Sequence, residues 1–156
     1  MLATTPDFWT QLNAEPTVGT LSRVRTWIRR FRRRVPEAWM KVTNLSSKMV
    51  VADRAQVASH GAARRKGLLG RKGLDSGEGL WILPCEAVHT FGMQFAIDLV
   101  YLDRNHKVKK VRSAVPAWRL SACLSAHSVL ELPAGTVLAT QTKRGDQLEM
   151  SPLTLR

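Results

Sequence analysis

The chain has 156 residues, 44% hydrophobic and 23% charged, which is typical of one globular domain with a short extension. No apolar run reaches the ~18 residues needed to cross a bilayer, and two cysteines are too few for a disulfide-stapled secreted domain, so we expect a soluble protein in the reducing cytoplasm. The net charge of +12 is concentrated at the front, because residues 1–48 carry nine Lys or Arg against three acids, whereas residues 49–156 carry fifteen against nine.

Residues 1–39 are predicted to be a basic extension outside the domain. Residues 1–19 follow neither the helical nor the strand period, and Pro6 and Pro16 interrupt any regular element. From residue 20 to residue 35, apolar side chains recur every three or four positions among seven arginines without one acid, which predicts a basic amphipathic helix. Such a helix would suit an anionic membrane surface or nucleic acid.

The remaining part, residues 40–156, is predicted to be a compact β-rich domain. Its β-branched and aromatic residues predict strands at 41–45, 48–58, 80–83, 95–103, 107–115, 128–132 and 147–151. The segment 61–71 favours a short helix, residues 72–79 form a glycine-rich loop, and residues 136–144 favour a brief helical turn. The expected fold is mainly β: a small jelly-roll-like sandwich or partly open barrel with one short helix.

Several motifs in this order resemble one known family. They are VVADRAQVASHGAARRKGLLGRKGL, GEGLWILPCEAVHTFGMQFAIDLVYLD, SVLELPAG and GDQL. The chain from about Met40 to Met150 is similar to the uncharacterised bacterial and archaeal family called domain of unknown function 192. Typical of that family are the Gly-Leu-Leu-x-Arg stretch at 67–71 and a His-Thr stretch ahead of an Ile-Asp strand, although many relatives have Pro where this chain has Ala96.

The resemblance implies a compact, mainly β domain of jelly-roll type with a small helix packed on it. It implies no reaction, cofactor or partner. Relatives commonly begin just ahead of the first strand, and Met40 stands at that position here, so one hypothesis is that translation starts at or near Met40.

Two Cys-x-x-x-His pairs are the first candidate site. Cys85 with His89, and Cys123 with His127, have the four-residue spacing that places both side chains on one face of a strand or helical turn. Two thiolates and two imidazoles are a tetrahedral zinc set, so zinc is the one cofactor that the sequence suggests. The alternatives are that Cys85 is a small buried hydrophobe and His89 donates to a backbone carbonyl, or that the cysteines form a disulfide, which the cytoplasm disfavours.

A second hypothesis makes Cys85 a nucleophile. His89 would then be its base, and Asp98 or Glu86 would orient the imidazole. The alternative for Asp98 is that its carboxylate caps or braces the entry to the strand at 95–103.

Further clusters allow charge-driven or stacking interactions. The helix and the residues after it carry Arg64, Arg65, Lys66, Arg71 and Lys72, and one strand carries Lys107, Lys109, Lys110 and Arg112. The first group could contact phosphates, or be a solvated face with Arg71 paired to Asp75 or Glu78, and the second is typical of a protected edge strand. Aromatic residues that could form a stacking platform for bases or sugars are predicted to be core; they are Trp81, Phe91, Phe95, Tyr101 and Trp118.

The interpretation that we favour is a non-enzymatic domain that binds a protein or small ligand on the surface formed by residues 84–93 and the 71–79 loop. The residues expected to contribute are Arg71, Cys85, His89, Thr90, Met93 and Asp98. A metal-dependent or thiol enzyme using Cys85 and His89 is the first alternative, and a charge-driven binder of nucleic acid or membrane surfaces is the second.

Overall fold

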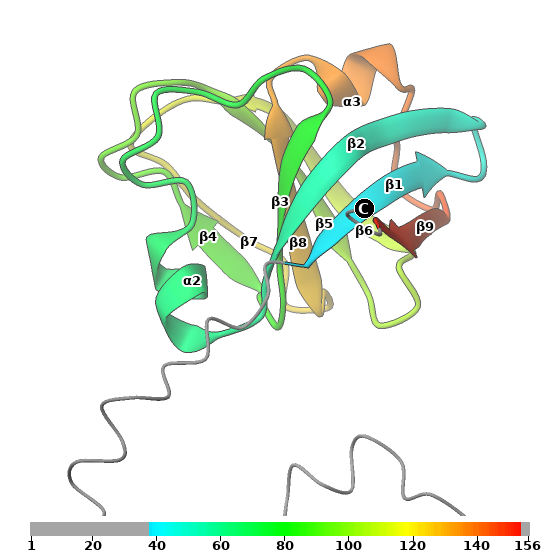
Figure 1. Ribbon diagram of the computed structural model, residues 1–156, viewed down its shortest axis with the longest axis horizontal. Helices are drawn as coiled ribbons and strands as arrows, with labels where there is room; N and C mark the ends of the chain where they lie inside the picture. Colours follow the sequence, from blue (N-terminus) through cyan, green and yellow to red (C-terminus); the bar gives the residue numbers. More distant parts are fainter. Residues whose placement is uncertain (1–37, 154–156) are drawn as a thin grey trace, which may run out of the picture. The chain divides into compact units, whose positions relative to one another are not determined.

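A computed structural model describes residues 38–153, which form one strongly curled β-sheet with a small second sheet and two short helices (Figure 1). The mainly β fold expected from the sequence is confirmed. The predicted helix at 20–35 lies outside the described residues. Strand β1 begins at Trp39, so the strand includes one residue ahead of the expected boundary at Met40.

The predicted strands all form. They are β1 (Trp39–Asn44), β2 (Met49–Ala58), β3 (Glu78–Ile82), β5 (Ile97–Leu102), β6 (Val108–Val115), β8 (Ser128–Pro133) and β9 (Leu148–Pro152). They make one sheet in the order β6-β5-β8-β3-β2-β1-β9, in which β2 and β3 are parallel and the other neighbours are antiparallel. Strand β6 is an edge, as its lysines predict.

The central strands β5 and β8 are buried along almost their whole length because both faces of the sheet are covered. Along β5, Leu99 and Tyr101 pack into one apolar cluster, while Val100 and Leu102 pack into a second cluster on the opposite face. This arrangement explains why β5 is a continuous apolar run and does not alternate with polar residues. Because successive side chains of a strand point to opposite faces, neighbouring residues on β5 or β8 face different apolar clusters.

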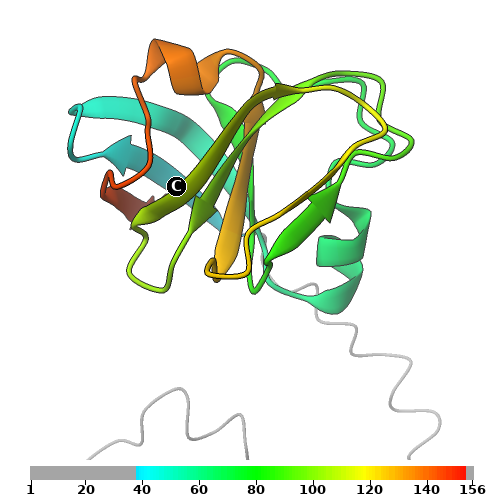
Figure 2. The same ribbon diagram turned by 180° about the vertical axis from the view of Figure 1, so that it is seen from behind.

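The second sheet, β4 (Ala87–His89) paired with β7 (Leu120–Ala122), was not predicted. It lies beside helix α2 (Gly61–Lys66) at one end of the molecule (Figure 1). Seen from behind, the chain crosses from β6 in the large sheet to β7 in the small one (Figure 2). The small sheet thereby covers one of the two apolar clusters. A cavity lined by side chains lies between α2 and the segment that carries β4.

Two short helices form, whereas the sequence predicted one helix and a helical turn. Helix α2 begins after His60, which makes no side-chain cap, and ends at Gly67, whose φ of 49° lies in the region that favours glycine. None of its residues is buried, and the following Leu68 anchors it in the apolar cluster. In helix α3 (Thr136–Ala139) the Val137 amide donates to the Asp98 carboxylate on β5. Within residues 38–153 no helix is long and apolar enough to cross a membrane.

Candidate functional site

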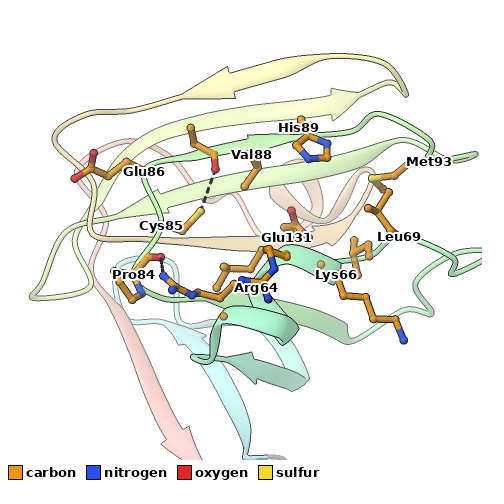
Figure 3. A pocket seen from close by; sticks show the side chains of 16 residues that line it. Arg64, Lys66, Leu69, Pro84, Cys85, Glu86, Val88, His89, Met93 and Glu131 are labelled. Atoms are coloured by element: carbon orange, nitrogen blue, oxygen red, sulfur yellow. Dashed lines mark hydrogen bonds between the residues drawn. The ribbon is translucent and has the colours of Figure 1, made fainter.

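A cavity of about 410 Å³ lies between α2 and the segment that carries β4 (Figure 3). That volume is in the usual range of small-molecule pockets. The lining residues are Gly61, Arg64, Arg65, Lys66, Gly67, Leu68, Leu69, Ile82, Pro84, Cys85, Glu86, Ala87, Val88, His89, Met93 and Glu131. Residues of the expected surface at 84–93 therefore form most of one wall of the cavity. The other wall is formed by α2 and the turn after it, and not by the 71–79 loop that the sequence suggested.

Glu131 is the one lining residue that combines a charge-bearing group with nearly complete burial, and the sequence analysis missed it. It lies on β8 directly opposite Leu80 of β3 and Leu99 of β5, so its side chain shares their face of the sheet. Only 4% of the residue is exposed, and its Oε2 atom has no hydrogen-bond partner. Burial raises the pKa of Glu131 to about 7, although the Arg71 charge acts in the opposite direction.

A second unpaired polar atom lines the same cavity. The Arg64 Nε is buried and has no partner, while the Nη1 of the same guanidinium donates to the Pro84 carbonyl at 3.0 Å. The cavity thus presents a buried acceptor on Glu131 and a buried donor on Arg64. Unpaired buried groups of this kind are rare in folded proteins and each one costs free energy.

Cys85 and His89, which the sequence suggested as site residues, both line the cavity. The Cys85 thiol donates to the Ala87 carbonyl at 3.1 Å, and burial raises its pKa. A nucleophilic cysteine needs a lowered pKa, so this environment favours the inert thiol. The His89 ring is stacked on Phe91 with 5.2 Å between ring centroids.

The four residues of the zinc hypothesis line three separate pockets. Cys123, whose sulfur lies 3.5 Å from the Ser125 hydroxyl, lines a groove beside β6, and His127 lines a third hollow. In the stretch from residue 38 to residue 153, no three His, Cys, Asp or Glu side chains are grouped closely enough to hold a metal ion. The predicted four-ligand site is therefore not formed, and both cysteines are free.

Asp98 faces away from the cavity, which corrects its assignment as an orienting acid and as a binding residue. It is fully buried on β5, on the face opposite to Leu99. Its Oδ1 accepts from the Ala114 amide at 2.7 Å and its Oδ2 from the Val137 amide at 2.8 Å. The carboxylate thus braces β6 and the start of α3, in line with the structural alternative.

Thr90 does not line the cavity but fixes a neighbouring loop. Its hydroxyl donates to the Pro116 carbonyl at 2.8 Å and accepts from the Arg119 amide at 2.9 Å. Its own carbonyl accepts from the Trp118 amide at 3.0 Å. Met93, in contrast, is buried in the cavity wall.

We expect Thr90→Val to lower the free energy of unfolding by about 1 kcal/mol, because the Pro116 carbonyl and the Arg119 amide lose a partly buried hydrogen bond without a change in side-chain shape. Hydrogen exchange should also speed up at the Arg119 amide. Chemical unfolding and exchange measured by NMR would check both effects. Thr43→Val is the matched control, since the Thr43 side chain makes no hydrogen bond within residues 38–153 and its replacement should change stability by only a few tenths of a kcal/mol.

The contacts of Arg71 and of the α2 cations differ from those expected from the sequence. Arg71 donates to the Gln56 side chain at 2.5 Å and does not pair with Asp75 or Glu78, because Glu78 binds Arg54 at 2.7 Å. Arg71 does not line the cavity. The α2 cations Arg64, Arg65 and Lys66 do line it, so they are more than a solvated helix face.

The prediction that the aromatic residues are core is right for two of them and wrong for two others. Trp81 and Tyr101 are buried and Phe95 is partly buried, but Phe91 is 45% and Trp118 is 65% exposed. The period-two pattern fails here because both residues lie outside the strands, in the loops after β4 and before β7.

The comparisons agree with this fold. The family model of DUF192, described as an uncharacterized ACR, matches residues 40–150, and no curated protein gives a significant match. A "putative transcription regulator" from Sinorhizobium meliloti 1021 has 17% identity, a TM-score of 0.65, and matches over 73% of this chain and 93% of its own. A protein of unknown function from Novosphingobium aromaticivorans DSM 12444 has 22% identity, a TM-score of 0.62, and matches over 71% and 83%.

At these identities the two structures establish the fold alone, whereas the family model spans most of the chain. The chain therefore belongs to the uncharacterised DUF192 family.

Proposed function

We propose that the protein is a small cytoplasmic binding domain, with no catalytic step of its own, whose cavity between α2 and β4 takes a small ligand or a side chain of a protein partner. The observation that carries this proposal is Glu131, a buried residue in the lining of an open cavity whose Oε2 atom has no hydrogen-bond partner. A ligand that donates a hydrogen bond to Glu131 would offset the cost of that burial.

The walls around Glu131 support a ligand with an apolar body. Leu68, Ile82, Val88 and Met93 are buried beside the cavity, and its polar side chains come from α2, from residues 85–89 and from β8. A pocket with apolar walls and polar groups at fixed positions is typical of ligand binding.

Two observations favour binding over thiol catalysis. The Cys85 thiol is engaged by the Ala87 carbonyl and has a raised pKa, so its thiolate form is disfavoured at neutral pH. Asp98 lies on the other face of β5 and is not available to orient His89. The two free thiols are also what a reducing compartment maintains.

Four compounds with the same isobutyl body test the proposal: isobutanol, isobutyramide, isobutylamine and isobutyrate. At pH 8, where Glu131 is mostly ionised, the three donors should shift the amide NMR signals of Leu68, Val88 and Glu131 in the full-length protein. Isobutyrate should shift them least, since two carboxylates repel each other.

Glu131→Met is the matching variant, because it keeps an unbranched side chain of similar length and removes both oxygens. We expect it to abolish the preference for donors, whereas Glu149→Gln, at an exposed position on β9, should leave it unchanged. Equal shifts for all four compounds, or a donor preference that survives Glu131→Met, would contradict the proposal.

A further inference from the structure

A row of aromatic rings leads away from the cavity. It starts at His89, which lines the cavity and points along its upper wall in Figure 3. Phe91 follows, with 5.2 Å between its ring centroid and that of His89, and Trp118 lies at 5.9 Å from Phe91. Two segments far apart in the sequence thus extend the cavity wall with an exposed aromatic surface.

Trp118 is held exposed at an energetic cost. Its φ of 62° lies in the left-handed region, which bulky residues rarely adopt, and its side chain is 65% exposed. The Thr90 carbonyl accepts from the Trp118 amide, and the Thr90 hydroxyl binds the residue on either side of the Ala117–Trp118 pair. A strained backbone that is fixed so firmly is typical of a functional position.

The two unpaired groups in the cavity specify what a ligand must offer. Glu131 Oε2 requires a donor when it is ionised, and Arg64 Nε requires an acceptor. A hydroxyl group can act as donor or acceptor, and a sugar ring carries several hydroxyls together with apolar C–H faces. Those faces suit both the apolar walls of the cavity and the rings of Phe91 and Trp118.

We propose that the cavity and the aromatic row together bind a carbohydrate chain, with one sugar ring above Glu131 and the next ones against Phe91 and Trp118. This inference rests on the proposed binding function of the cavity. An acidic sugar is favoured whose hydroxyl groups face Glu131 and whose carboxylates lie against Arg64, Arg65 and Lys66, because these cations line the cavity and the Glu86 carboxylate is turned away from its centre (Figure 3).

A titration of the full-length protein with trigalacturonate, cellotriose and acetyl-trialanine amide tests the inference. Trigalacturonate should shift the indole N–H signal of Trp118, assigned with Trp118→Phe, together with the amide signals of Val88 and Glu131. Cellotriose should shift the same signals at higher concentration. The trialanine peptide represents the competing occupant.

Trp118→Ala should weaken the binding of trigalacturonate by about tenfold, since the variant removes a large apolar contact area. The control is Leu124→Ala, which removes another exposed apolar side chain (84% exposed) from outside the cavity and the aromatic row. Because neither side chain belongs to the core, both variants should fold.

The outcomes separate the inference from the function on which it rests. If neither trisaccharide binds but the isobutyl donors or the peptide do, the carbohydrate inference is overturned and the binding function stands. If trigalacturonate binds equally well to Trp118→Ala, the role of the aromatic row is overturned. If none of these compounds shifts the signals of the cavity, both proposals fail together.

Discussion

Replacing Asp98 by Ala is expected to lower the free energy of unfolding by about 4 kcal/mol, one of the two largest effects predicted for this protein. The carboxylate accepts the amides of Ala114 and Val137 in a fully buried position. Without it, the buried Val137 N–H and the partly buried Ala114 N–H have no acceptor, and a small void is left beside β5. The Ala114 backbone, with φ at 47°, would also lose the contact that holds it in the left-handed region.

Urea unfolding followed by circular dichroism would measure the effect. Asp53→Ala is the matched control, since Asp53 is an exposed carboxylate on β2 of the same sheet and should contribute less than about 0.5 kcal/mol. A loss of less than about 1 kcal/mol in Asp98→Ala would contradict the bracing role. The isobutyl donors should still bind to folded Asp98→Ala, because Asp98 faces away from the cavity.

Much of the large sheet could be predicted because its strands carry strong local signals. The run of β5 is apolar on both faces, and β2 and β6 are rich in β-branched residues. Strands β4 and β7 have only three residues each, with one buried side chain apiece, so no periodicity could reveal them. The small sheet exists because it covers an apolar cluster, and such tertiary packing leaves little trace in the local sequence.

The site could be predicted only in part for the same reason. Of the residues expected to form a binding surface at 84–93, Cys85, His89 and Met93 line the cavity. Glu131 was missed, although an acid between two leucines in the strand predicted at 128–132 was a usable signal.

Asp98 and Glu131 are both acids within apolar strands, yet only one faces the cavity. The register pairs Glu131 with Leu99 and Asp98 with Leu132, which puts the two acids on opposite faces. The sequence contains the alternation, but it does not show which face α2 and the small sheet will cover.

Stability should fall as the pH rises through the range in which Glu131 ionises, and Glu131→Gln should remove that dependence. The pKa of Glu131 is raised from 4.5 to about 7 in the folded protein, so between these values the folded state binds more protons than the unfolded state. The associated stability is fully present below pH 4.5 and lost above pH 7. A shift of this size corresponds to about 3 kcal/mol.

Urea unfolding of the full-length protein at pH 4.5, 6 and 8 would test this prediction through the difference between the variant and the wild type. The stability of Glu131→Gln relative to wild type should increase by about 3 kcal/mol from pH 4.5 to pH 8, whereas Glu149→Gln should show a flat difference. A flat difference for Glu131→Gln would mean that its carboxyl is solvated or paired in solution. The same ionised, unpaired carboxylate that weakens the wild type at pH 8 is the group that a bound donor would satisfy, so a ligand of this cavity should raise wild-type stability most at that pH.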